Sequence, residues 1–406
     1  MTSKIKVVDL IMGGGKSTFC HKMMFEDEDR KYIYITPYLD EIKRVIGDKD
    51  DRTDFYLKRN FKEPLHLGEG KLEGLHELLS NDNNIATTHA LFKMTTTETI
   101  DLIASGEYTL MLDEALDVVD TFDISIKDYD LLVKNKLIEV DKRGFVKWIS
   151  DEYEGEFDKF KIKCQNGIIA QLKKTSRIHF LVWNFSPESF RSFKEVYIFT
   201  YLFEASHMKY YFDMHDIKYE KYTIEDNKLV LHKNKKPYNK SELRKLINIY
   251  EGNLNIVGDK DTALSVNWLK NYPGLKSKLK NNVYNYFKHI QNAKAHTIIW
   301  TTFKSSKKAL SGSGYTRRFI PCNTRATNEY KDCYNLAYCC NRYISPDYVD
   351  YFYKHGITVN EDLFALSELL QWMWRSAIRE GKPINIYIPS KRMRKLLVDW
   401  LNNENI

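Results

Sequence analysis

Met12-Gly13-Gly14-Gly15-Lys16-Ser17-Thr18 is the stretch of this 406-residue sequence that decides its fold. The residues before it, 5–11, are mostly apolar and β-branched and predict a buried strand, while residues 17–24 predict the start of a helix. A glycine turn between a strand and a helix surrounds a phosphate with backbone N–H groups. The alternative is an ordinary glycine turn followed by an exposed lysine.

The sequence therefore predicts a phosphate loop that binds ATP together with Mg²⁺. Lys16 is expected to contact the β- and γ-phosphates as a catalytic residue, and the Ser17 hydroxyl to bind the metal ion. The nucleotide-binding residues are predicted to be Gly13, Gly14, Gly15, Lys16, Ser17 and Thr18.

Composition limits the class of protein. The chain is 43% hydrophobic and 29% charged, as in globular proteins, and its length favours two domains. No apolar run is long enough to cross a bilayer and no signal peptide is evident, so we expect a cytoplasmic protein, in the host cytoplasm if a phage encodes it, with no membrane partner. The net charge of +7 permits nucleic-acid binding without requiring it. The six cysteines lack Cys-x-x-Cys spacing, so we expect reduced thiols and no metal bound by them.

Strands that alternate with helices predict an α/β fold with two parallel-sheet domains in tandem. The predicted strands are 32–36, 85–88, 108–112, 178–183, 196–200, 255–257, 297–300 and 384–388. Residues from about 120 to 175 interrupt this alternation and are interpreted as an insertion. Because the strand pattern restarts after Lys209, we place the domains at 1–210 and 211–406.

Asp113-Glu114 follows the apolar run 108–112 and is the predicted partner of the phosphate loop. Parallel sheets present their ligands at the carboxyl ends of their strands. We expect Asp113 to bind the Mg²⁺ and Glu114 to orient the attacking water, both as catalytic residues. The alternative is an exposed acidic turn.

Gln371, Arg375 and Arg379 fall at i, i+4 and i+8 of a predicted helix over 363–379 and would share one face. Arginines on such a face can stabilise the charge of a transferring phosphoryl group, so all three residues are predicted to be catalytic. The alternative is a solvated basic edge on a core helix.

The order of these motifs resembles that of the superfamily 2 helicases with DEAD/DEAH-like motifs, and most of all their compact phage or mobile-element replication members. Arg379 lies one residue later than its counterpart in that family. The resemblance covers residues 5 to about 390 and implies two RecA-like domains, with ATP in the cleft between them and a nucleic-acid strand across both. It rests on Gly13 to Ser17 (motif I), Thr36-Pro37 with Glu41 (Ia), Asp113-Glu114-Ala115 (II), Thr200 to Phe203 (III), Arg325 to Asn328 (V) and Gln371 to Arg379 (VI).

Hydroxyls, amides and cations at predicted strand ends suit contact with a phosphate backbone. Phe303 or Tyr315 is a candidate for stacking on a base. The predicted partners are single-stranded or forked nucleic acid, with DNA favoured, and replication proteins are candidate further partners. The candidate nucleic-acid residues are Thr36, Pro37, Thr88, His89, Phe303, Lys304, Arg325 and Asn328.

The predicted function is an ATP-dependent helicase or translocase. A nucleoside or nucleotide kinase also uses a glycine loop, but it does not need a second α/β domain. A DNA-packaging motor usually adds a metal nuclease, for which the second half shows no acidic cluster. A non-catalytic binding module would not need Lys16, Asp113 and Glu114 together.

Overall fold

The structure is a computed structural model that describes residues 4–47, 60–68, 70–142, 144–150, 152–236, 238–323 and 329–403. The chain divides into two compact units. Unit 1 contains residues 1–235 together with 345–359, and unit 2 contains 236–344 together with 360–406. Among the described residues, no helix is both long enough and apolar enough to cross a membrane.

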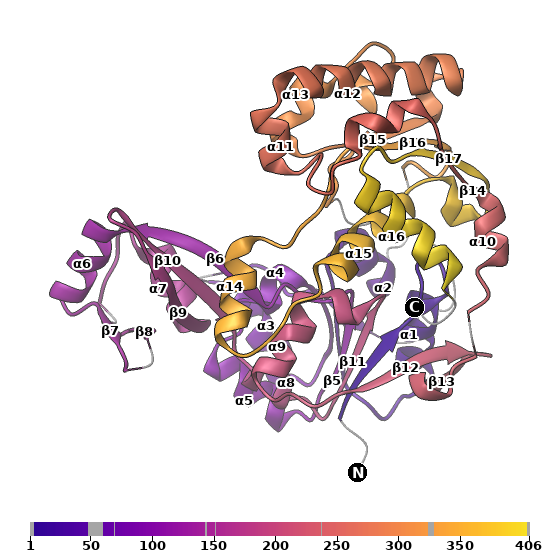
Figure 1. Ribbon diagram of the computed structural model, residues 1–406. Helices are drawn as coiled ribbons and strands as arrows, with labels where there is room; N and C mark the ends of the chain where they lie inside the picture. Colours follow the sequence, from indigo (N-terminus) through magenta and orange to yellow (C-terminus); the bar gives the residue numbers. More distant parts are fainter. Residues whose placement is uncertain are drawn as a thin grey trace. The chain divides into compact units, whose positions relative to one another are not determined.

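Unit 1 is built on an eight-stranded sheet (Figure 1). All neighbouring strands are parallel except the β12–β13 pair. Side chains of Val8, Tyr34, Met111 and Phe199 form one buried cluster with residues of helices α1 and α2, which therefore cover one face of the sheet. The strands lie in the order β13 (Lys228–Leu231), β12 (Glu220–Glu225), β1 (Ile5–Asp9), β11 (Glu195–Thr200), β5 (Thr109–Asp113), β2 (Tyr32–Thr36), β4 (Asn84–Thr88) and β3 (Phe61–Lys62).

Most helices of unit 1 outside its inserted sheet follow strands in βα order, as the alternating sequence predicts, whereas α14 joins this unit from a later part of the chain. They are α1 (Lys16–Glu26), α2 (Leu39–Ile46), α3 (Lys71–Ser80), α4 (His89–Phe92), α5 (Thr97–Ser105), α8 (Glu188–Arg191), α9 (His207–Met214) and α14 (Pro346–Lys354).

The predicted insertion contains a sheet of its own, which we call the middle sheet. Its strands are antiparallel and lie in the order β6 (Val119–Ser125), β10 (Ile178–Phe185), β9 (Gly167–Lys174), β8 (Phe145–Trp148) and β7 (Ile138–Val140), with α6 (Ile126–Lys134) and α7 (Asp158–Gln165). The assignment of 178–183 to the parallel alternation is wrong, because β10 pairs with β6 and β9.

Helix α14 belongs to unit 1 although its neighbours in sequence belong to unit 2. Tyr351 Oη donates to Asn184 Oδ1 on β10 (2.9 Å), and Lys354 Nζ donates to the Leu172 carbonyl on β9 (2.7 Å). The Tyr348 ring lies 4.6 Å from the His207 ring on α9. The ribbon of Figure 1 shows α14 beside the middle sheet, so these contacts bring a late segment of the chain onto an early one.

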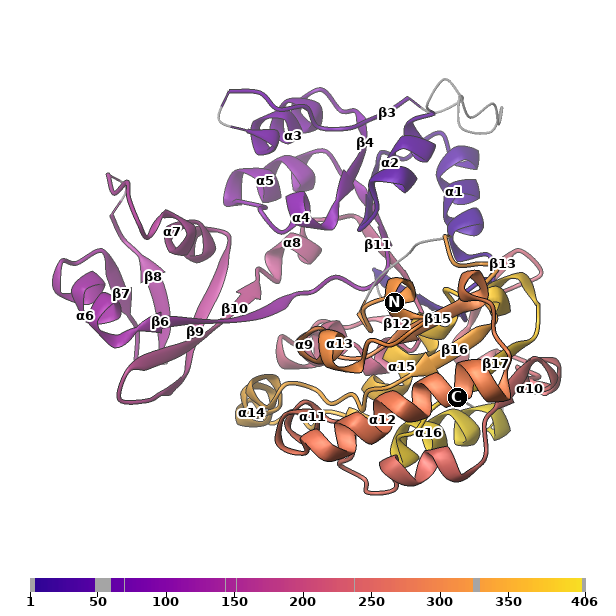
Figure 2. The same ribbon diagram turned by 90° about the horizontal axis from the view of Figure 1, so that it is seen from above.

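Unit 2 contains a four-stranded sheet in which all pairs are parallel (Figure 2). Trp268 and Val283, from α11 and α12, pack with Trp300 and Tyr387 of the sheet in one buried cluster, so these two helices cover one face. The strands lie in the order β14 (Ile247–Ile249), β17 (Ile384–Tyr387), β16 (Asn335–Tyr338) and β15 (Ile298–Thr301). The helices are α10 (Ser241–Leu246), α11 (Val266–Asn271), α12 (Pro273–Asn285), α13 (Lys307–Leu310), α15 (Glu361–Met373) and α16 (Lys391–Asn402).

The predicted fold class, two parallel-sheet α/β domains, is confirmed. The division between the units falls at 235/236, later than the predicted 210/211, because β12 adds to the first sheet beside β1 and β13 pairs with β12. Residues 255–257, predicted as a strand, lie in the 3-10 helix Asn253–Gly258, and the first strand of the second sheet is β14 instead.

Candidate nucleotide-binding site

The predicted site residues of unit 1 lie along one edge of its sheet. In the strand registers, Asp9 is level with Thr200, Phe199 with Asp113, and Thr36 with Thr88. The carboxyl ends of β1, β11, β5, β2 and β4 therefore meet at a common edge, which we call the carboxyl edge. Ligands of open parallel sheets bind at this edge.

The backbone of the glycine turn has the form that a phosphate loop needs. Gly13 and Gly15 adopt φ values of 78° and 88°, a left-handed conformation that glycine accepts without strain. A β-carbon at Gly14 would lie 2.8 Å from Leu10 Cγ and 3.0 Å from the Ile11 carbonyl oxygen. Helix α1 begins at Lys16, and its N-cap residue Gly15 has no side chain that could cap the helix. The loop fits the phosphates of a nucleotide.

Lys16 lies over this loop. Its ammonium donates to the Leu10 carbonyl (2.6 Å) and to the Ile11 carbonyl (3.2 Å). Its positive charge also lowers the pKa of Asp113, which opposes the upward shift that burial causes. The lysine is therefore close enough to the end of β5 for its charge to act there.

Asp113 is a buried carboxylate, 7% exposed, at the end of β5. Burial raises its pKa to about 7, and the negative charges of Glu114 and Glu41 add to that shift. Tyr34 Oη, from β2, donates to Asp113 Oδ2 (3.2 Å). The side chain is thus held by the neighbouring strand, and a nearby cation would favour its charged form.

A hydroxyl and a carboxylate oxygen are the protein ligands that Mg²⁺ prefers. Ser17, half-buried in the first turn of α1, and Asp113 supply these two groups at the carboxyl edge. The chemistry of these two groups fits a magnesium ion, which they would hold.

Asp9 is a site residue that the sequence analysis missed. Its carboxylate accepts hydrogen bonds from the N–H groups of Leu202 (2.8 Å) and Phe203 (3.0 Å). It therefore ties the end of β1 to the turn after β11, the place of the predicted motif III. The sequence did contain a signal for Asp9: it is a carboxylate at the end of an apolar strand, just before the glycine turn.

The prediction that Gln371, Arg375 and Arg379 share one helix face is wrong. Helix α15 ends at Met373, because Ser376 is extended (ψ −171°) and both its N–H (3.1 Å) and its hydroxyl (2.7 Å) donate to the Met373 carbonyl. Gln371 remains on α15, where its amide donates to Ser367 Oγ (3.1 Å). Arg375 lies in the turn and is only 8% exposed, whereas Arg379 is exposed on the 3-10 helix Ala377–Glu380.

The nucleic-acid candidates of unit 1 have different environments. Thr36 is fully buried and its hydroxyl accepts a hydrogen bond from the Tyr38 N–H (3.4 Å), while Pro37 after it is half-buried. Thr88 caps α4 through a hydrogen bond from the Leu91 N–H (3.3 Å). His89 is 9% exposed, and its Nε2 lies 3.0 Å from the Asp113 carbonyl oxygen. The histidine thus contacts the end of β5.

The candidates of unit 2 include Phe303 and Lys304, which line a pocket of about 180 Å³ together with Thr302, Pro321, Cys322, Asn323 and Arg342. Arg342 pairs with Glu368 (2.8 Å). Tyr315 is 1% exposed and its hydroxyl donates to the Leu310 carbonyl (2.7 Å), so the prediction that it stacks on a base is wrong. Arg325 and Asn328 lie outside the described residues.

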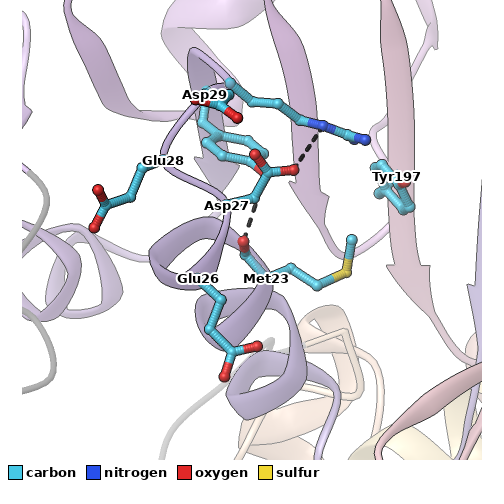
Figure 3. Close-up of a pocket in the computed structure, with 8 residues that line it drawn as sticks. Met23, Glu26, Asp27, Glu28, Asp29 and Tyr197 are labelled. Atoms are coloured by element: carbon cyan, nitrogen blue, oxygen red, sulfur yellow. Dashed lines mark hydrogen bonds and ion pairs between the residues drawn. The ribbon is translucent and has the colours of Figure 1, made fainter.

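A larger pocket, of about 580 Å³, lies at the far end of α1 (Figure 3). Its rim carries Asp27 and Glu28, and Asp27 pairs with Arg30 (2.8 Å). Tyr32, in its wall, is the first residue of β2, so the pocket lies at the amino ends of the strands and away from the phosphate loop. Its acidic side chains repel phosphate, so this pocket does not suit a nucleotide.

Sequence and structure comparisons place these features in context. The chain is 46% identical to the SPbeta prophage-derived protein YonV of Bacillus subtilis (strain 168), over 99% of both chains. Residues 119–183 match the family "YonV middle domain", and residues 241–401 match "YonV C-terminal Rossmann-like domain". The match to "YonV middle domain" covers most of the middle sheet.

Among solved structures, Xpd4 of S. tokodaii superposes with a TM-score of 0.53 at 10% identity, over 98% of this chain and 94% of that chain. A structure described as an XPD helicase gives a TM-score of 0.46 at 12% identity, over 97% and 95% of the two chains. The likeness to Xpd4 shows the fold, in which two parallel-sheet α/β domains follow one another along the chain.

Proposed function

The chain belongs to the YonV family, and on that premise we propose that it is an ATP-dependent helicase or translocase that acts on DNA in the replication of a phage or mobile element. The proposed cofactor is Mg²⁺ with ATP as the substrate. The proposed partner is single-stranded or forked DNA in the host cytoplasm, with replication proteins as further partners. The prophage origin of the YonV relative supports the phage context.

One observation carries this proposal: a glycine turn with Lys16 and the buried carboxyl of Asp113 lie at one sheet edge, in a chain with a second parallel sheet. The ordinary use of such an edge is to bind a nucleotide triphosphate. A kinase acting on a small molecule requires only the first sheet. A second RecA-like unit is what an ATP-driven motor needs in order to convert hydrolysis into movement along a strand.

Each of the proposed site residues has its own role in ATP hydrolysis or nucleic-acid binding. Lys16 binds the β- and γ-phosphates, and Ser17 and Asp113 hold the Mg²⁺, which supplies charge neutralisation when it is bound. Glu114 orients water and accepts its proton. Arg375 or Arg379 of unit 2 stabilises charge on the phosphoryl group, with Gln371 beside them. Phe303 and Lys304 contact the nucleic-acid backbone or a base.

The test is ATP hydrolysis by the full chain with and without single-stranded DNA, RNA or a nucleoside. We expect strong stimulation by DNA and none by a nucleoside. Lys16→Ala should lower turnover by at least about a thousandfold, because a phosphate-loop lysine contributes orders of magnitude. Stimulation by a nucleoside alone would instead support a kinase. Lys16→Ala turnover within about threefold of wild type would refute the phosphate-loop assignment.

A further inference from the structure

The peptide that joins Asp113 to Glu114 is held from two opposite sides. Its N–H, which belongs to Glu114, donates to the Phe199 carbonyl on β11 (2.9 Å). Its C=O, which belongs to Asp113, lies 3.0 Å from Nε2 of His89. The N–H and C=O of a trans peptide point in opposite directions in one plane. These two contacts therefore fix the rotation of the peptide whose flanking side chains are the two candidate carboxylates.

This restraint acts on a backbone that would not hold its form alone. Glu114 adopts φ 70°, a left-handed conformation that a residue with a β-carbon keeps only where its surroundings impose it. Without the contact to His89, the C=O side of the peptide would lose the hydrogen bond that opposes the one made by its N–H. A rotation of this plane would re-aim Asp113 and Glu114 together.

The chemistry of the contact fixes the state of the imidazole. A carbonyl oxygen only accepts, so Nε2 of His89 must carry a proton and donate it. His89 is the first residue of α4 and directly follows Thr88 at the end of β4. Strand β2 lies between β4 and β5, so the imidazole reaches past the end of β2 to the end of β5.

We infer that His89 is a positioning residue for ATP hydrolysis, which holds the Asp113–Glu114 peptide in the orientation that aims both carboxylates. This inference rests on the proposed function, which assigns Asp113 and Glu114 their roles. His89 also connects the hydrolytic carboxylates to Thr88, a candidate nucleic-acid contact.

The test compares His89→Ala, His89→Gln and the control His66→Ala, which alters an exposed histidine of the same unit. We expect His89→Ala to lower the kcat of DNA-stimulated hydrolysis about tenfold or more, with the KM for ATP within about twofold of wild type. His89→Gln should recover most of this loss, since its amide N–H can donate to the same carbonyl. A kcat of His89→Ala within about twofold of wild type would overturn the inference. So would a His89→Gln variant as slow as His89→Ala.

A second measurement does not depend on hydrolysis. In protein labelled with ¹⁵N-histidine, the resonance that is lost in His89→Gln should be that of an Nε2–H tautomer. An Nδ1–H tautomer at this position would overturn the inference whatever the activity. An absence of ATP hydrolysis in the wild type would instead refute the proposed function, and the tautomer would still report on the contact between His89 and Asp113.

Discussion

Asp113 is buried, and burial favours the neutral form of its carboxyl group unless a cation lies close to it. Its pKa is raised to about 7 by burial and by the charges of Glu114 and Glu41, while Lys16 opposes that shift. An unfolded aspartate has a pKa of about 3.9. Between these two values the folded chain binds a proton that the unfolded chain releases, so the stability that this proton confers is lost as the pH rises through about 7.

Asp113→Asn should remove this pH dependence, because an amide does not titrate. Without Mg²⁺ and nucleotide, we expect the free energy of unfolding of the wild type, relative to that of the variant, to fall by more than about 1.4 kcal/mol between about pH 5 and about pH 8, the equivalent of one pKa unit. Urea unfolding in the presence of a chelator measures this difference. Parallel pH profiles for the two proteins would show that Asp113 is not the titrating group.

Replacing Asp113 or Glu114 by the matching amide should impair different steps of the reaction. Glu114→Gln should keep ATP affinity but slow hydrolysis by at least about a hundredfold, because an amide cannot accept the proton of water. Asp113→Asn should weaken the Mg²⁺-dependent part of nucleotide binding. Nucleotide titrations with and without Mg²⁺, followed by single-turnover hydrolysis, separate these effects. Identical behaviour of the two variants would contradict this division of roles.

At the scale of elements, the end of α15 separates the two arginines. Arg375 is buried in the turn after the helix, whereas Arg379 lies exposed on the following 3-10 helix. A guanidinium held by its surroundings loses less freedom when it engages a phosphate than an exposed one does. Arg375 is therefore the stronger candidate for the residue that stabilises the transferring phosphoryl group.

We expect Arg375→Ala to slow single-turnover hydrolysis by at least about a hundredfold while ATP affinity stays within about threefold. Arg379→Ala, the matched control in the next turn, should change the rate by less than about threefold. Arg375→Lys keeps the positive charge but lacks the planar guanidinium group. Thermal unfolding of this variant tests whether a lower hydrolysis rate results from a change in folding. If hydrolysis were slower in Arg379→Ala than in Arg375→Ala, Arg379 would be the residue that stabilises the phosphoryl group.

Local patterns in the sequence predicted those elements whose form depends on near neighbours. The glycine turn, β5 with Asp113 and the start of helix α1 are confirmed because strand and helix periodicity and glycine chemistry are local. The end of α15 was missed because it depends on distant groups: the Ala377 N–H donates to the Cys333 carbonyl (2.9 Å). The restraint of Asp113 by Tyr34 and His89 was missed because it joins the ends of β2, β4 and β5, which are far apart in the sequence.

Periodicity also does not say which strands pair. The apolar pattern of β10 predicted a buried strand correctly, yet it gave no indication that the strand joins the antiparallel middle sheet. The same limit applies to α14, whose sequence position suggests unit 2 although its contacts lie in unit 1.

At the scale of the whole molecule, Tyr351 tests whether α14 is part of unit 1. Tyr351→Phe removes the hydroxyl that donates to Asn184, a buried hydrogen bond, and should cost about 1 kcal/mol. Amide hydrogen exchange should become faster in β9 and β10 and stay unchanged in β15 and β16, which belong to unit 2. Tyr353→Phe, at an exposed position of the same helix, is the control. Faster exchange confined to unit 2 would contradict the contacts of α14.

The return of α14 also sets an order for synthesis. Domains generally fold as they leave the ribosome, with the N-terminal one first. Here residues 236–344 of unit 2 are translated before the last segment of unit 1, residues 345–359. The surface of β9 and β10 that receives Tyr351 and Lys354 therefore stays uncovered while much of unit 2 emerges. A nascent chain halted just after residue 344 would carry an incomplete unit 1, which chaperones or proteases can reach until residue 359 has left the exit tunnel.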